Sequence, residues 1–227
     1  MKKRILIEAS GSLVSNWVIK AIKESGHVAI ASDITEESVG RFLADEFVTV
    51  PKSDHPDLWS HLESILVENK IDLVIPSLDE TLILWAKKKK YLKSKYGIDV
   101  IISNMKTIET FIDKYRTFLF FSSAHIPTPA TSLQKVYPLV KPRFGRGGKG
   151  IEQTEDENID MKGKISQEFI EGEEYTIDCL IDHKGKPIYI VPRKRLVVKD
   201  GKSVNGIVVN NARINEWVTK ICKQIKF

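Results

Sequence analysis

The chain has 227 residues, of which 42% are hydrophobic and 29% charged, as in an ordinary soluble globular protein of one large or two small domains. This composition excludes a disordered chain, a collagen, a coiled coil and a disulfide scaffold. The formal charge of +5 raises the question of an anionic or nucleic-acid partner. Residues 1–110 carry 15 Lys+Arg and 16 Asp+Glu, whereas residues 111–227 carry 20 and 14. The basic excess therefore lies in the second half.

Two cysteines, Cys179 and Cys222, stand far apart and belong to no Cys/His cluster, which excludes zinc and thioredoxin-like sites. Cys179 lies in the apolar run YTIDCLI and is expected to be a small buried hydrophobe. No window reaches the roughly 18 apolar residues of a membrane span. The apolar run ILI before Glu8 is too short for a signal peptide. We therefore expect a cytoplasmic protein with no membrane partner.

The first half alternates between short apolar runs and amphipathic segments with apolar residues at helical spacing. Strands are predicted at residues 5–9, 27–32, 47–50, 72–76 and 98–103, and helices at 13–24, around 39–43, at 56–69 and at 80–96. Repeated βα units with short connections imply a parallel sheet with right-handed crossovers. We expect an open α/β domain over about residues 1–105.

Three features of this half leave functional alternatives. The lysines at 87–90 suggest a nucleic-acid patch, but four consecutive residues point all around a helix, so a solvated face is favoured. Asp33 follows the second strand, as a ribose-binding acid would, but Gly11 is the single glycine of the first turn, which disfavours NAD. Asp79 and Glu80 follow the strand at 72–76, where ligands of α/β folds collect, so a substrate role stays open.

The second half has a different character. Residues 107–124 are predicted to form a helix, which Pro127 and Pro129 end. From Tyr137 onward the pattern is rich in strands and punctuated by glycines, with a hairpin turn at 182–186 and a closing helix at 213–225. Residues 106–227 are therefore expected to form an α+β domain built on antiparallel strands.

The segment GRGGKG at residues 145–150 satisfies the pattern GxGxxG. The residues that follow form no apolar helix, so this is not a dinucleotide fingerprint, and Lys149 precedes Gly150 rather than the Ser or Thr of a P-loop. Kinase segments HRD and DFG are absent. What remains is a glycine hairpin with Lys141 on the preceding strand. Its backbone N–H groups and cations suit a polyphosphate, although a plain surface hairpin has the same pattern.

Four segments in order resemble those of the ATP-grasp family, of the type similar to the carbamoyl-phosphate synthase large chain and to amino-acid ligases. They are DKYRT at 113–117 with HIPTP at 125–129, LVKP at 139–142 leading into the glycine loop, QEFIEGEEYTID at 167–178, and RKR at 193–195. The resemblance covers nearly the whole chain. It implies a pre-ATP-grasp domain at 1–105 and a partial ATP-grasp domain at 106–227, with a small lid subdomain at about 126–170.

The resemblance also implies roles for individual residues. Two lysines would contact the nucleotide phosphates, and the glycine loop would close over them. The backbone of residues 168 and 170 would pair with adenine, and residue 174 with the ribose. The implied nucleotide-binding residues are Lys114, Lys141, Arg146, Gly147, Gly148, Gly150, Gln167, Glu168, Phe169, Ile170 and Glu174, and the implied catalytic residues are Arg193 and Arg195, facing the acyl phosphate.

Each role has a plainer alternative. Lys114 could instead lie on a plain helix surface, Glu174 in a solvated turn, and Arg193 and Arg195 on a charged strand edge, although the nucleotide-site roles are favoured. No segment resembling the family's E-x-N-P-R is present, so the ligands of Mg²⁺ are expected beyond residue 227 and none within this chain. Whether the chain is a fragment or naturally shortened, we expect it to be incomplete for catalysis alone.

The resemblance implies an ATP-dependent carboxylate–amine ligase or a carbamoyl-phosphate synthase-like activity through an acyl phosphate, with ATP and Mg²⁺ as cofactors. The alternative is a nucleotide-binding partner or sensor without turnover. The expected partners are ATP and a small carboxylate or amino acid, with a homodimer left open. Nucleic acid ranks last, because around the glycine loop Phe144 is the one aromatic among the basic residues.

The position of the basic residues supports this order. The excess gathers at Lys141, Arg143, Arg146, Lys149 and residues 193–195. Such a distribution is the one expected for holding one triphosphate rather than a nucleic-acid backbone.

Overall fold

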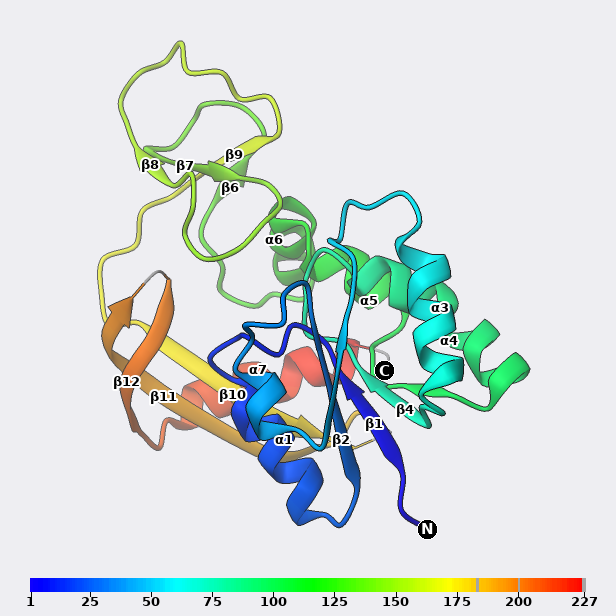
Figure 1. Ribbon diagram of the computed structural model, residues 1–227. Helices are drawn as coiled ribbons and strands as arrows, with labels where there is room; N and C mark the ends of the chain where they lie inside the picture. Colours follow the sequence, from blue (N-terminus) through cyan, green and yellow to red (C-terminus); the bar gives the residue numbers. More distant parts are fainter. Residues whose placement is uncertain (183, 200, 226–227) are drawn as a thin grey trace. The chain divides into compact units, whose positions relative to one another are not determined.

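The computed structural model describes residues 1–182, 184–199 and 201–225, and it divides into two compact units, Met1–Met105 and Lys106–Phe227 (Figure 1). The N-terminal unit is built on one parallel sheet with the strand order β3-β2-β1-β4-β5. Its strands are β1 Arg4–Ile7, β2 Val28–Asp33, β3 Glu46–Thr49, β4 Leu73–Ile75 and β5 Asp99–Val100. The predicted open parallel sheet is confirmed.

Helices cover both faces of this sheet because successive residues of a strand point to opposite sides. The helices are α1 Ser15–Glu24, α2 Gly40–Leu43, α3 Leu58–Glu68 and α4 Leu82–Tyr96. Ile5 and Ile7 belong to one buried core with Ile19 and Ile22 of α1. Leu6 belongs to the other, which α3 and α4 supply. The unit is therefore a three-layer α/β fold.

Two details of this unit differ from the predictions. The last strand is shorter than residues 98–103, because the chain turns at Ile102, whose N–H donates to the Val100 carbonyl. The lysine run is only partly a solvated face. Lys88 lies 4.6 Å above the ring of Trp59, and the Nζ of Lys89 donates to the Ile102 carbonyl at 2.7 Å.

The C-terminal unit begins with two helices, α5 Met105–Phe111 and α6 Lys114–Ser123, where one helix was predicted over 107–124. The break lies at Asp113, whose carboxylate accepts the N–H groups of Tyr115 and Arg116 and so starts a new helix. A four-stranded antiparallel sheet of order β6-β9-β7-β8 follows. Its strands are β6 Thr131–Ser132, β7 Leu139–Pro142, β8 Glu152–Gln153 and β9 Lys164–Gln167.

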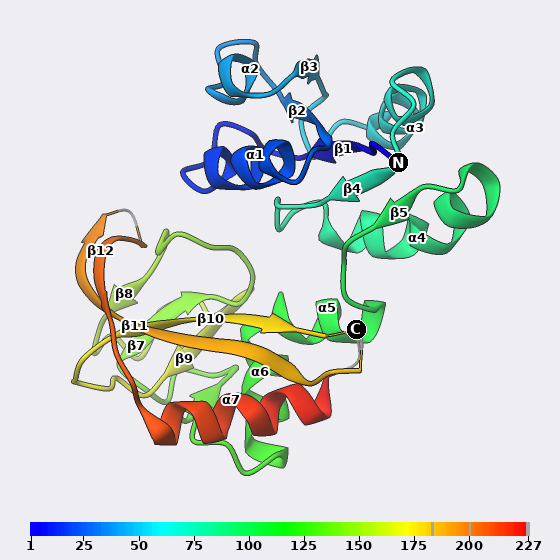
Figure 2. The ribbon, with the colours of Figure 1, turned by 90° about the horizontal axis from the view of Figure 1, so that it is seen from below.

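A second antiparallel sheet contains β10 Tyr175–Ile181, β11 Pro187–Lys199 and β12 Lys202–Val208, and the last helix, α7 Ala212–Gln224, runs along it (Figure 2). The predicted turn at 182–186 is present: the carboxylate of Asp182 accepts the N–H groups of Lys184 and Lys186. His183 lies outside the described residues. Both antiparallel sheets agree with the predicted α+β class.

The prediction that Cys179 is buried is wrong, because this residue is exposed. Successive side chains of a strand point to opposite faces, and the consecutive residues Asp178, Cys179 and Leu180 of β10 are all exposed, so neither face of the strand is covered there. In the part of the chain that the structure describes, no helix has the length and apolar character needed to span a membrane.

Candidate functional site

A half-buried lysine lies on the small four-stranded sheet. Lys141 is on β7, and its Nζ donates to the Oε1 of Gln167 at 2.5 Å. Gln167 closes β9 and donates in turn to the Oγ1 of Thr131 at 2.8 Å. The register pairs Leu139 with Gln167 and Lys141 with Ile165, which places the Lys141 and Gln167 side chains on one face of the sheet. Burial, and then the positive charge of Lys114, lower the pKa of Lys141.

The second predicted lysine contacts the glycine loop directly. Lys114 is the first residue of α6, and its Nζ donates to the Gly145 carbonyl at 2.8 Å. Its backbone N–H donates to the Arg143 carbonyl at 3.1 Å. The start of α6 is therefore attached both to the end of β7 and to the loop. The structure brings the two predicted lysines and the glycine loop together.

The glycine loop joins two antiparallel strands, β7 and β8. Gly145, Gly147, Gly148 and Gly150 have φ values of 96°, 70°, 72° and 71°. Residues other than glycine rarely adopt this left-handed region of backbone conformation. The conformation of the loop is therefore by itself a reason for its glycines. Residues 144–150 are all exposed, which is the condition for backbone N–H groups to meet a ligand.

An ion pair fixes the beginning of the loop. Asp113, of which 2% is exposed, accepts hydrogen bonds from the Nε and Nη2 atoms of Arg143 at 2.8 and 2.6 Å. The same carboxylate caps α6 through Tyr115 and Arg116. In the sequence, Asp113 is the first residue of the segment DKYRT and was not predicted to have a role of its own. An aspartate just before a helical segment is the signal that identifies it as a cap.

The segment predicted to face adenine is extended and exposed. The N–H of Glu168 donates to the Ala130 carbonyl at 2.8 Å, and the Glu168 carboxylate accepts the Ala130 N–H. Among the described residues, no backbone hydrogen bond uses the N–H of Ile170 or the carbonyl of Glu168. One donor and one acceptor, two residues apart, are thus available to a ligand. Phe169 beside them is 47% exposed.

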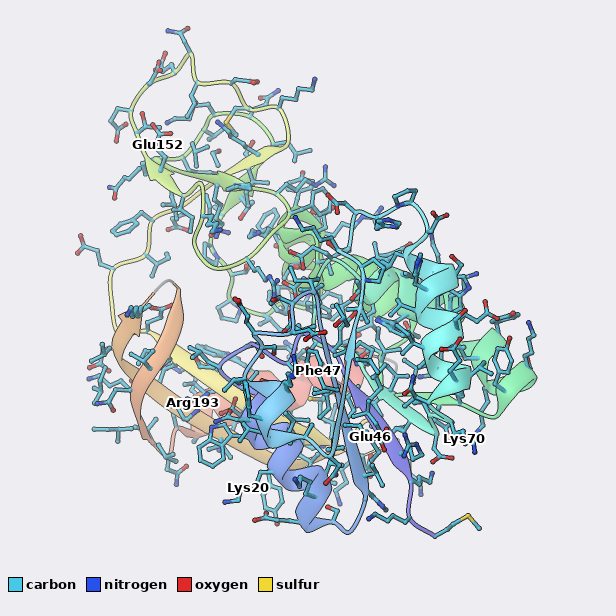
Figure 3. All side chains as sticks on the ribbon, viewed as in Figure 1. Lys20, Glu46, Phe47, Lys70, Glu152 and Arg193 are labelled. Atoms are coloured by element: carbon cyan, nitrogen blue, oxygen red, sulfur yellow. The ribbon has the colours of Figure 1, made fainter. Side chains whose placement is uncertain are left out.

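The predicted catalytic arginines lie on β11 and both form ion pairs with acids of the preceding segment. Arg193, labelled in Figure 3, donates to Asp178 from Nε at 2.5 Å and from Nη2 at 3.2 Å. Arg195 pairs with Glu174, the predicted ribose ligand, and is 12% exposed. Its Nε is buried without a partner among the described residues. Arg195 therefore has one donor left over for an acceptor that the described residues do not supply.

The basic cluster is less available than its sequence suggests. Arg143 pairs with a carboxylate, as described above, and so does each of the residues 193–195. The partner of Lys194 is Glu173. The antiparallel register of β10 and β11 brings the acids at 173–178 opposite these bases. Among the seven basic residues named from the sequence, Lys141 has a neutral partner, the Gln167 amide, and is the clearest candidate for an anionic ligand.

No metal site accompanies these residues. Within residues 1–182, 184–199 and 201–225, no group of three or more His, Cys, Asp or Glu side chains is placed to hold a metal ion. Asp33 does not resemble a ribose ligand either. Its two carboxylate oxygens accept the N–H groups of Gly11 at 2.6 Å and of Ile34 at 2.8 Å, so it shapes the first turn.

The N-terminal unit contains a cavity of about 350 Å³ at the carboxyl ends of its strands. The residues in its wall include three acids, Asp33, Asp54 and Glu80, one base, Lys52, and apolar residues such as Leu62. Ligands of open α/β sheets bind at this edge. Glu80, for which a substrate role was left open in the sequence analysis, therefore lines a cavity.

A fourth carboxylate in the cavity wall is structural. Glu8 is 5% exposed and accepts hydrogen bonds from the N–H groups of Ser77 and Leu78, the Oγ1 of Thr81 and the Nε1 of Trp85. These four bonds hold the loop after β4 against the end of β1. Glu8 supplies negative charge to the cavity while its oxygens are occupied.

Comparisons with known proteins show which families this chain is similar to. The sequence profile described as an ATP-grasp domain matches residues 111–226, and that of a PylC-like N-terminal domain matches residues 5–101. The chain is 28% identical over 219 residues to carbamoyl-phosphate synthase of Methanobrevibacter smithii, an alignment that covers 87% of this chain and 56% of that protein. The chain thus spans little more than half the length of this relative.

Solved structures show the same fold at low identity. The biotin carboxylase domain of Hydrogenobacter thermophilus 2-oxoglutarate carboxylase, solved with MgADP, ADP and bicarbonate, has a TM-score of 0.73 at 21% identity over 100% of this chain and 59% of its own. L-amino acid ligase of Bacillus licheniformis has a TM-score of 0.73 at 18% identity, over 97% and 59%. N5-carboxyaminoimidazole ribonucleotide synthetase of Thermotoga maritima has a TM-score of 0.67 at 20% identity, over 97% and 61%. With a profile match over more than half of its residues, the chain belongs to the ATP-grasp family.

Proposed function

We propose that this chain is the nucleotide-binding part of an ATP-dependent ligase of carboxylate–amine or carbamoyl-phosphate synthase-like type. The observation that supports this most is the Lys141 ammonium, half-buried near Lys114, with a neutral amide as its hydrogen-bond partner. Two neighbouring cations repel each other, and burial adds a desolvation cost. A polyphosphate between Lys141, Lys114 and the glycine loop would relieve both costs.

The remaining predicted residues suit the other parts of ATP. The carbonyl of Glu168 and the N–H of Ile170 offer the acceptor and donor that an adenine edge requires, and Phe169 provides apolar area beside them. Glu174 would receive the ribose only by exchanging its pair with Arg195. Arg195, released or reoriented in this way, would present its guanidinium to the transferred phosphoryl group.

The chemistry proposed is transfer of the γ-phosphoryl group to a carboxylate or bicarbonate, followed by attack of an amine on the acyl phosphate. The protein's contribution to such a transfer is positioning and stabilisation of charge, which lysines, arginines and loop N–H groups provide. The described residues hold no cluster suited to Mg²⁺.

Direct titration tests the proposal. Saturable binding of ATP and ADP is expected in calorimetry of the full chain, with GTP weaker because its base edge reverses the donor and acceptor that face residues 168 and 170. Absence of ATP binding at millimolar concentration would contradict the nucleotide site. Release of ADP in the presence of a carboxylate and an amine separates a ligase from a protein that only binds nucleotide.

We also propose that the cavity of the N-terminal unit holds the amine-bearing small substrate. Four acidic residues, Glu8 among them, against one lysine give its wall an acidic balance that attracts an ammonium group, while the apolar lining accepts a hydrocarbon stem. Titration with n-butylamine is expected to change tryptophan fluorescence saturably, since Trp85 donates to Glu8 in the cavity wall. Butyrate, of equal length and opposite charge, is expected to have no such effect.

Variants locate this response. Asp54→Asn is expected to weaken butylamine binding by about tenfold, the loss of one charge-assisted contact. Glu68→Gln removes an exposed carboxylate that does not line the cavity and is expected to leave binding unchanged. Equal binding of butylamine and butyrate, or equal effects of the two substitutions, would refute an ammonium site.

A further inference from the structure

The tip of the hairpin between β11 and β12 lies against the glycine loop. Gly201 at this tip has a φ of +71°, and a Cβ added there would lie 2.8 Å from the backbone carbon of Gly147 and 3.1 Å from its Cα and O atoms. Real Cβ atoms essentially never approach so closely. The contact therefore joins two backbones, and it requires that residue 201 have no side chain.

Arg195 orders the same tip. Its Nη2 donates to the Gly201 carbonyl at 2.8 Å, while its Nη1 pairs with Glu174. With 12% of its side chain exposed, Arg195 is held between β10 and the hairpin tip. The position of Gly201, and with it the surface on which Gly147 rests, thus depends on Arg195.

The other side of the loop is also attached. Lys114 binds the Gly145 carbonyl, and the Asp113–Arg143 pair fixes the residues that precede the loop. The loop is therefore held from α6 at Gly145 and from the β11–β12 hairpin at Gly147. These two attachments come from segments on either side of it in the chain.

We propose that Gly201 is a positioning residue for the glycine loop: its lack of a side chain lets the loop rest on the hairpin tip, and Arg195 sets the position of that tip. The identity of the ligand that the positioned loop would cover rests on the proposed nucleotide site. The contact of the loop with the hairpin tip does not depend on that proposal. The hairpin acts on a ligand only through the loop, so Gly201 is not a catalytic residue.

A pair of glycine substitutions separates docking from backbone strain. Gly201→Ala and Gly163→Ala impose similar strain, because Gly163 has a φ of +70°, but an added Cβ at Gly163 meets nothing within 4 Å. Without nucleotide, trypsin is expected to cleave after Arg146 and Lys149 roughly tenfold faster in Gly201→Ala than in the wild type, since local opening of the loop governs cleavage. Gly163→Ala is expected to be cleaved at the wild-type rate.

Gly201→Asn covers the case in which the alanine variant does not fold. Asparagine tolerates the left-handed region better than alanine does, yet it retains the Cβ that collides with Gly147. It is expected to give the same fast cleavage with a smaller loss in Tm. Equal cleavage rates in the Gly201 and Gly163 variants would overturn the proposal.

Nucleotide binding provides a separate readout. Weaker ATP binding by Gly201→Ala than by Gly163→Ala is expected if the docked loop covers the phosphates. If no form of the chain binds ATP while the cleavage rates differ as expected, the proposed nucleotide site is wrong and the docking role of Gly201 stands.

Discussion

Replacing Asp113 with alanine is expected to lower the free energy of unfolding of the C-terminal unit by about 3–5 kcal/mol, the usual cost of breaking a buried ion pair on one side. The Asp113 carboxylate accepts four hydrogen bonds, from Tyr115 and Arg116 N–H groups and from two nitrogens of Arg143. Its loss removes a helix cap and leaves the Arg143 guanidinium without its carboxylate. Urea denaturation of both proteins measures the difference.

The effect has a defined pH dependence. Burial alone would raise the pKa of Asp113, but the hydrogen bonds from Arg143 and the Arg116 N–H outweigh it, and the pKa is lowered. The carboxylate therefore stabilises the fold fully above the pKa of an unfolded aspartate, about 3.9, and this contribution is lost as the pH falls through the lower folded value. The difference between wild type and Asp113→Asn should shrink over the same interval.

Asp160→Ala is the matched control. Asp160 is an exposed acid of the same unit, and its carboxylate accepts one backbone N–H, that of Lys162, at 2.9 Å. Its removal is expected to change stability by about 0.5 kcal/mol or less. If Asp113→Ala costs no more than Asp160→Ala, the Asp113–Arg143 pair does not anchor the loop and α6 as we describe.

The N-terminal fold was predictable because its information is local. Leu58, Leu62 and Leu66 recur at helical spacing and are all buried, and Leu6 faces the core opposite that of its neighbours Ile5 and Ile7. The exposure of Cys179 was not predictable in this way. An apolar run predicts a strand, but whether the faces of that strand are covered depends on the packing of other segments, which the run does not contain.

The candidate site could be predicted as a set of residue types and less so as a set of contacts. The sequence pointed to Lys114, Lys141 and the glycine loop, and the structure places them together. It did not reveal that Arg193 and Arg195 pair with Asp178 and Glu174, because that pairing depends on the register of β10 against β11. Gly201 was not among the predicted site residues, although an Asp-Gly dipeptide between extended segments is a hairpin signal.

Lys141→Ala is expected to weaken ATP binding by about 10- to 100-fold, the loss of a strong hydrogen bond from a charged group. The alanine variant keeps β7 and its pairing with β9, since no backbone bond of the strand involves the side chain. Calorimetric titration with ATP measures the change. Lys162→Ala, which removes an exposed lysine of the same unit, is the control expected to bind ATP as the wild type does.

Lys141→Arg tests what the lysine provides. Arginine retains the charge but replaces a compact ammonium with a wider planar group, in a place where Gln167 holds the Nζ at 2.5 Å. Affinity between those of the wild type and of Lys141→Ala is expected. A variant equal to Lys141→Ala would show that geometry at this position outweighs charge.

The lowered pKa of Lys141 gives this prediction a second measurement. A phosphate binds the protonated lysine, and the pKa of Lys141 lies below that of an ordinary lysine because of burial and Lys114. ATP affinity should therefore begin to fall at a lower pH than it would for an ordinary lysine, and Lys141→Ala should lack this component. If the alanine variant matched the wild type in both affinity and pH dependence, Lys141 would serve only to pair with Gln167, and the phosphate site would have to be sought among the other cations of the loop.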